Sequence, residues 1–168
     1  LSEGTTKILQ KYEYIDDVPI LLNLKENKIV GVIGDTKSMF KIAKSLIVQI
    51  SALHTYTDVK LALFFKENEL SKYSWVKWIP HFFSEDKKTR MIASDKQSTQ
   101  NVLFSLVSLL RSRSELISDS NSEDGSTKIT KDIDFSPHYV VICTSNDIFE
   151  NESIEKYIRS NDNLGITF

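Results

Sequence analysis

Three residues between positions 31 and 38 have the types and the spacing of a phosphate-binding loop. Gly31, Lys37 and Ser38 match the first glycine, the lysine and the hydroxyl residue of the P-loop pattern G-x-x-x-x-G-K-[ST]. In such a loop, backbone N–H groups at the start of a helix hold the phosphates, the lysine neutralises their charge and the hydroxyl binds magnesium. Thr36 replaces the second glycine of the pattern, and Gly34 is the other glycine of the turn. Gly31, Gly34, Lys37 and Ser38 are therefore candidate contacts of a nucleotide phosphate.

The flanking residues predict the strand, turn and helix that this chemistry needs. Lys28–Gly34 has the composition of a short buried strand, and apolar residues recur at helical spacing from Met39 to Leu53. Thr36 opposes the chemistry, because a β-branched residue is strained where a glycine adopts a positive φ or lies close to a phosphate. The residues alone leave two interpretations open, a phosphate site and an ordinary turn between a strand and a helix.

A second test of nucleotide hydrolysis is the residue that follows a later apolar strand. In P-loop ATPases an aspartate at the end of such a strand holds magnesium. Here the run Tyr139–Cys143 is followed by Thr144, and Asp147 comes three residues further on, where it is expected to start a turn. Because both the second glycine and this acid are missing, we expect no efficient hydrolysis, no required cofactor and at most weak binding of ATP and magnesium.

The other reactive residues form no recognisable catalytic or metal-binding pattern. His54, His81 and His138 are far apart and have no acidic or cysteine partner at metal-ligand spacing. Cys143 lies in an apolar run and is expected to be a buried thiol. The sequence therefore predicts no catalytic residue and no metal site.

An aromatic segment, Ser74–Phe83, contains both tryptophans of the chain. Its aromatic residues could stack on bases, but the charge that flanks them is mixed. We expect Trp75 and Trp78 to pack in the core. If either tryptophan is exposed, a protein-contact surface becomes the favoured interpretation.

Strands and helices are predicted to alternate along the chain, which favours a mainly parallel sheet. After a leading segment (1–15), residues 18–24 and 29–33 predict a strand hairpin. Further strands are expected at 59–65, 90–93, 138–143 and 164–168, and helices at 37–53, 67–78, 95–113 and 152–159. Residues 114–134 are rich in polar residues and predict a flexible surface loop. The fold class is therefore α/β, a three-layer fold with helices on both faces of the sheet and an N-terminal hairpin at its edge.

Length and composition are those of one ordinary globular domain. The chain has 168 residues, of which 40% are hydrophobic and 26% charged, so residues 1–168 are expected to form a single domain. A net charge of −2 favours no nucleic-acid partner. No membrane-spanning segment or signal peptide is recognisable, and we expect the domain to be part of a longer, membrane-anchored protein.

The order of several segments resembles one protein family. The chain is similar to the EssC/EccC-type ATPases of the FtsK/SpoIIIE family, which serve bacterial type VII secretion. It matches their ATPase-like domain that precedes the first of the tandem ATPase domains. The similarity runs from about Leu9 to Phe168, with its most specific element at Trp75–His81. The other matching segments are Val18-Pro19, Ile29–Asp35, Leu46–His54, Asp58–Ala62 and Pro137–Val141.

This resemblance implies a RecA-like fold derived from P-loop NTPases, with degenerate nucleotide motifs. It also implies a location at the cytoplasmic face of the bacterial membrane and a parent protein that forms hexamers. The implied partners are the downstream ATPase domains of the same chain and other membrane components of the secretion system. The implied role is the export of small helical proteins.

Three functions remain as hypotheses. The favoured one is a non-catalytic structural module that couples the membrane segment of a secretion motor to its ATPase domains, in a parent protein that is itself an ATPase. The second is a regulatory or active nucleotide-binding domain with Lys37 and Ser38 on the phosphates. The third is part of a DNA translocase, which the acidic balance of the chain disfavours.

Overall fold

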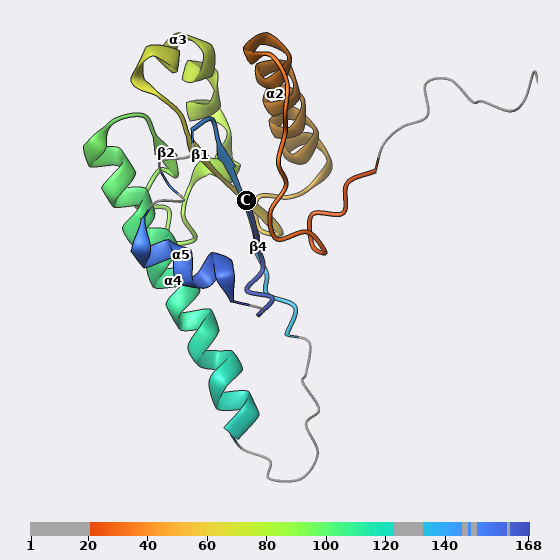
Figure 1. Ribbon diagram of the computed structural model, residues 1–168, viewed down its shortest axis with the longest axis vertical. Coiled ribbons are helices and arrows are strands. Elements are labelled where there is room, and N and C mark those ends of the chain that lie inside the picture. Colours follow the sequence, from red (N-terminus) through yellow and green to blue (C-terminus); the bar gives the residue numbers. More distant parts are fainter. Residues whose placement is uncertain (1–20, 123–132, 146–147, 149–150, 161) are drawn as a thin grey trace, which may run out of the picture.

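The computed structural model describes residues 21–122, 133–145, 148, 151–160 and 162–168. Its centre is a parallel sheet of four strands in the order β2-β1-β3-β4 (Figure 1). The strands are β1 (Val59–Phe64), β2 (Ile92–Ala93), β3 (His138–Cys143) and β4 (Ile166–Thr167). Every strand pair in this part of the chain is parallel, as the alternation of strands and helices predicts.

The pairing of β1 with β3 is the longest in the sheet. It runs without a break from Val59 opposite His138 to Phe64 opposite Cys143. Both strands are buried along most of their length. Parallel strands in the middle of a sheet have this composition because both of their faces are covered.

Helices cover both faces of the sheet, so the fold has three layers. Ala62, Phe64 and Val141 lie in one core cluster with side chains of α4 (Lys96–Ser122) and α5 (Glu152–Arg159). Leu61, Leu63 and Val140 lie in a second cluster with side chains of α2 (Thr36–Leu53). Figure 1 shows α2 on the side of the sheet opposite α4 and α5. The three-layer α/β class is therefore confirmed.

Four short helical segments connect β1 to β2 and complete the α2 side of the molecule. They are the 3-10 helices η1 (Glu67–Glu69), η2 (Ser74–Trp78) and η3 (Pro80–Phe82), and the single turn α3 (Leu70–Tyr73). Tyr73, Val76 and Phe82 from these segments are almost fully buried. They fill the second core cluster beside Ile47 and Ile50 of α2.

The predicted flexible loop at 114–134 is wrong in its first part, because α4 extends to Ser122. Arg113 is buried, and Ile117 packs one helical turn later against the core that Leu110 also joins. This apolar stripe continues the helix through a segment whose other residues are mostly polar and exposed. The polar residues on the solvent side of this helix have the composition that is typical of a loop. Residues 123–132 and the predicted leading segment 1–15 lie outside the described residues.

The predicted N-terminal hairpin is also wrong within the described residues, since residues 21–33 contain no strand. Asn23 instead makes a turn, in which its side-chain oxygen accepts a hydrogen bond from the Lys25 backbone N–H. Lys28 and Val30 then pair with Phe168 beyond β4: Phe168 N–H donates to Lys28 O (2.8 Å) and Val30 N–H to Phe168 O (2.7 Å). This pattern is that of parallel strands. The segment around Lys28 and Val30 therefore adds to the parallel sheet at the edge beyond β4. It does not form an antiparallel hairpin with the residues that precede it in the chain.

Arg113 fastens the end of the chain to β3. Its guanidinium donates hydrogen bonds to the carbonyl oxygens of Leu164 (2.8 Å), Gly165 (3.1 Å) and Pro137 (2.7 Å). It also lies over the ring of Phe135. Burial lowers the pKa of Arg113, but a guanidinium starts so high that it stays charged. The three carbonyls supply the partners that a buried cation needs.

We predict that Gly165→Ala strongly destabilises the fold. Gly165 has a φ of +65°, and an added Cβ would lie 2.7 Å from both Arg113 Nη1 and Phe135 Cβ. The backbone strain and the overpacking together are expected to cost about 2–4 kcal/mol in urea unfolding. Gly31→Ala is the control and should change stability by less than about 0.5 kcal/mol, because nothing lies within 4 Å of its added Cβ. Equal losses in the two variants would contradict the prediction.

We also predict that the domain loses stability between about pH 6.5 and pH 4 because of His138. Burial first, and then the positive charges of Lys25 and Arg113, lower the pKa of His138 to about 4. Its Nε2 lies 3.0 Å from the Thr167 hydroxyl. The folded state holds the neutral imidazole, so the unfolded chain takes up a proton first as the pH falls. The loss approaches about 3 kcal/mol near pH 4.

The pH dependence is measured by urea unfolding at closely spaced pH values. His138→Gln should flatten the slope between pH 6.5 and pH 4. The matched control is His54→Gln, which changes an exposed histidine and should keep the slope. A slope that persists in the His138 variant would assign the acid sensitivity to other groups.

Candidate functional site

The candidate phosphate loop lies at the carboxyl end of the segment that pairs with Phe168. Gly31–Asp35 follows this segment, and α2 begins at Thr36. The predicted order of extended segment, turn and helix is therefore present. All residues from Gly31 to Met39 are exposed, including Lys37 and Ser38, so the loop is open to solvent.

The two glycines of the loop do not have the conformation for which a phosphate loop uses glycine. Neither Gly31 nor Gly34 has a positive φ. A Cβ added to Gly31 would meet nothing within 4 Å, and one added to Gly34 would only touch the Met39 side chain at 3.9 Å. The turn is thus one that ordinary residues could form, which explains how Thr36 is accommodated at the start of the helix.

The Asp35 side chain caps the N-terminus of α2. Its side-chain oxygen Oδ1 accepts hydrogen bonds from the backbone N–H groups of Lys37 and Ser38, both at 3.0 Å. Hydrogen bonds from Ser38, by its side chain and its backbone, hold the pKa of Asp35 below its usual range, and the backbone of Lys37 adds to this effect. These N–H groups are the free donors that make a helix N-terminus an anion site. Here the protein's own carboxylate uses them.

Thr144, at the strand end where an ATPase carries an aspartate, also has its hydrogen-bond partners within the protein. The Thr144 hydroxyl donates to Glu69 Oε2 at 2.8 Å, and the Thr144 N–H donates to Phe64 O at 2.9 Å. Glu69 further pairs with Lys72 at 3.4 Å. A carboxylate therefore does lie beside the end of β3, but it comes from η1 and both of its oxygens have partners. Sequence reasoning missed Glu69 because only the parallel pairing of β1 and β3 brings it there.

The environments of His81 and Cys143 do not suggest a catalytic or metal-binding role. His81 is buried, and its Nε2 lies 2.9 Å from the carbonyl oxygen of His54. Among the described residues, no group of three or more His, Cys, Asp or Glu side chains could hold a metal ion. Burial raises the pKa of the partly buried Cys143 thiol to about 12. A thiol with so high a pKa is a poor nucleophile.

The two tryptophans have different environments. Trp75 packs against the second core cluster, as predicted. Trp78 is 79% exposed, so its predicted place in the core is wrong. The 3-10 helix η2 is short, and Val76 and Tyr73 already fill the space beneath it. A protein-contact surface therefore becomes the favoured interpretation of this segment.

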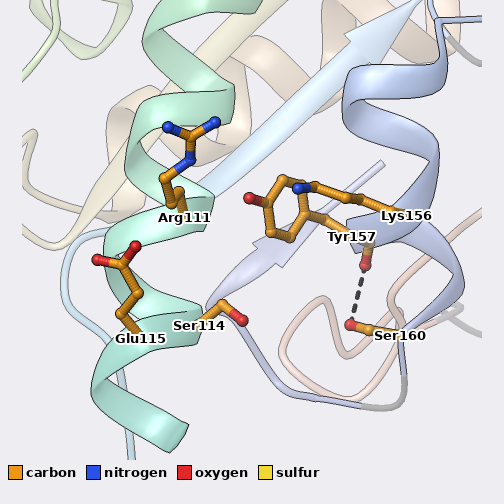
Figure 2. Close-up of a pocket in the computed structure, with 6 residues that line it drawn as sticks. All are labelled: Arg111, Ser114, Glu115, Lys156, Tyr157 and Ser160. Atoms are coloured by element: carbon orange, nitrogen blue, oxygen red, sulfur yellow. Dashed lines mark hydrogen bonds between the residues drawn. The ribbon is translucent and has the colours of Figure 1, made fainter. Parts of the chain in front are cut away.

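Concave surfaces occur elsewhere on the molecule. A groove between α4 and α5 has a volume of about 610 Å³. Figure 2 shows the residues that line it: Arg111, Ser114, Glu115, Lys156, Tyr157 and Ser160. A second cavity, of about 580 Å³, lies at the amino ends of β1 and β3 between Leu24 and His138. Neither cavity is lined by Lys37 or Ser38. The candidate loop therefore contributes to neither of these two cavities, where small-molecule sites are usually found.

The chain is related over almost its whole length to proteins of bacterial type VII (ESX) secretion systems, which confirms the resemblance inferred from its motifs. The ESX secretion system protein EccC of Geobacillus thermodenitrificans is 26% identical over 168 residues, 99% of this chain. YukB of Bacillus subtilis, another ESX secretion system protein, has the same identity and coverage. The type VII secretion system protein EssC of Staphylococcus aureus is 20% identical over 158 residues.

The chain spans about a tenth of the length of these curated relatives. No protein-family model matches it. None of the helices in the described ranges is long and apolar enough to cross a membrane. The comparison therefore relates this chain to one domain-sized stretch of a much larger secretion protein.

We predict that the Asp35 side chain stabilises α2 through its hydrogen bonds to the helix. Asp35→Ala removes the acceptor for two N–H groups and should lower the thermal midpoint by about 2–4 °C. Asp35→Asn is the matched control, because asparagine caps helices as well as aspartate does, and its midpoint should stay near that of the unsubstituted chain. Equal losses in both variants would show that the negative charge, and not the cap, matters.

Proposed function

We propose that this domain is a non-catalytic contact module of a type VII secretion protein, and that it uses the surface around its P-loop-like turn to bind protein rather than nucleotide. The observation that carries the proposal is the Asp35 cap. A carboxylate bound to the N–H groups of Lys37 and Ser38 both occupies the phosphate position and repels an anion that approaches it.

The side chains around the turn also favour a protein partner. Ile33 is fully exposed, and four further apolar side chains in the preceding segment and the first turns of α2 are at least one-third exposed: Ile29, Val32, Met39 and Ile42. Phosphate loops present backbone N–H groups, whereas this loop presents an apolar tip. Exposed apolar patches on stable domains mark protein–protein contacts more often than small-molecule sites.

The proposal places the domain within a parent protein. Since the relatives are secretion system proteins about ten times longer than this chain, we propose that the parent is an ATPase of the FtsK/SpoIIIE type, held as a hexamer at the cytoplasmic face of the membrane. The domain would couple the membrane segment to the downstream ATPase domains and to other secretion components during the export of small helical proteins.

A second function keeps one specific observation in its favour. Lys37 and Ser38 do stand exposed at the N-terminus of an 18-residue helix that follows a segment of the sheet. If the Asp35 side chain moved away, the N–H groups it leaves could hold a phosphate. This alternative is a regulatory nucleotide site.

We predict that the isolated domain binds no Mg-ATP at millimolar concentration in calorimetric titration and hydrolyses none. Removing the competing carboxylate and restoring the glycine, in Asp35→Ala combined with Thr36→Gly, should produce weak binding that Lys37→Ala then abolishes. Submillimolar binding by the unsubstituted domain that is lost in Lys37→Ala would contradict the proposal and support the regulatory site.

A further inference from the structure

We propose that a second surface, centred on Trp78, docks an acidic, apolar segment of a protein partner. This surface, the Trp78 patch, consists of other residues than the P-loop-like turn, and the proposal does not depend on whether that turn binds nucleotide. Its six residues come from α2, α3, η2 and the segment before β2: Lys44, Lys72, Trp75, Lys77, Trp78 and Arg90.

The backbone of η2 holds the two tryptophans on one side of the molecule. A 3-10 helix has three residues per turn, so Trp75 and Trp78 project in nearly the same direction. The Trp75 indole N–H donates to Lys72 O at 2.9 Å, which fixes this ring against the body of the domain. Trp78 follows one turn later and is 79% exposed. A large, rigid aromatic group is therefore presented to solvent on a fixed support.

Cations surround these rings. Lys77 Nζ lies 5.1 Å from the ring centroid of Trp78, and Lys44 Nζ lies 5.9 Å from that of Trp75. Arg90 hydrogen-bonds to the carbonyl oxygen of Lys77, so its charge stays next to η2. Lys44, Lys77 and Arg90 are exposed. The two rings thus carry positive charge around an apolar centre.

Glu69, the acidic residue that pairs with Lys72 of the patch, already has partners for both of its carboxylate oxygens. Glu69 pairs with Lys72 and accepts the hydrogen bond from Thr144, and its side chain is only 17% exposed. Among the described residues, no ion pair joins Lys44, Lys77 or Arg90 to a carboxylate. Trp78 is the most exposed large aromatic side chain in the part of the chain that the structure describes, and positive charge gathers around it although the whole chain has a net charge of −2. The complementary ligand carries carboxylates around aliphatic side chains.

The ring arrangement favours protein over nucleic acid as the partner. Lys77 lies over the Trp78 ring and so covers one of the two faces on which a base could stack. The net negative charge of the whole chain also opposes a polyphosphate backbone. Tryptophan and arginine are the residues that most often dominate the binding energy of protein interfaces. Trp78 and Arg90 are therefore the expected anchors.

The test uses the unsubstituted 168-residue chain, which keeps both tryptophans of the patch. The probe is a synthetic amphipathic peptide of Glu, Leu and Ala, and its binding is followed by tryptophan fluorescence and by calorimetry. We expect saturable binding that weakens as NaCl is raised. In calorimetry, Trp78→Ala or Lys77→Glu should weaken it about tenfold or more. The same peptide with Lys in place of Glu should not bind.

Matched control variants distinguish specific binding at the Trp78 patch from non-specific hydrophobic or electrostatic binding. Phe104 is 75% exposed on α4, so Phe104→Ala removes a comparable aromatic group elsewhere. Lys156→Glu reverses a charge on α5, away from the patch. Neither control should change the affinity, and unfolding midpoints verify that all variants are folded. Equal weakening in the controls, no binding of the acidic peptide, or Trp78-dependent binding of oligothymidylate in its place would each overturn the proposal.

Discussion

The unbroken parallel pairing of β1 with β3 is the constraint from which the other features follow. Parallel strands need crossover connections, and both faces of this pair are buried, so helices must cover the sheet on both sides. The same pairing brings the carboxyl ends of the strands to one edge. Thr144 and Glu69 meet there although 75 positions separate them. Arg113 then fixes β4 beside β3 through three carbonyl oxygens.

The P-loop-like turn illustrates how one local arrangement can serve two different purposes. A helix N-terminus must satisfy its free N–H groups, and either a bound phosphate or a capping side chain can do so. The Asp35 side chain accepts hydrogen bonds from these N–H groups, so the turn needs no bound anion. The exposed apolar residues beside it make the surface hydrophobic. Lys37 and Ser38 are exposed and cost little at the start of a helix, so their presence is compatible with the Asp35 cap.

Most of the element order could be predicted from the sequence. The periods of the apolar residues located α2, β1, β3 and α5 within a residue or two, because long buried elements leave a strong pattern. The prediction was wrong where the apolar pattern was weak, or where the composition suited more than one kind of structure. The last turns of α4 carry only a narrow apolar stripe in a polar segment. Residues 21–33 have strand-like composition, but the backbone of Lys28 and Val30 pairs with Phe168 and not with a neighbouring hairpin strand.

Some features of the candidate site could likewise be predicted from the sequence, and others could not. The residue types alone showed that the second glycine and the strand-end acid are missing, since these are properties of single positions. The exposure of Trp78, the Asp35 hydrogen bonds and the arrival of Glu69 beside Thr144 were not predictable, because each depends on what surrounds the residue in space.

The sequence by itself therefore determined the fold class, the absence of the second glycine and of the strand-end acid, and the relationship to type VII secretion proteins. Only the tertiary structure decided which N–H groups the Asp35 side chain binds and that Trp78 is exposed. Hydrophobic periodicity is a local property that survives in a linear reading, whereas hydrogen-bond partners and solvent exposure arise only when distant segments pack together.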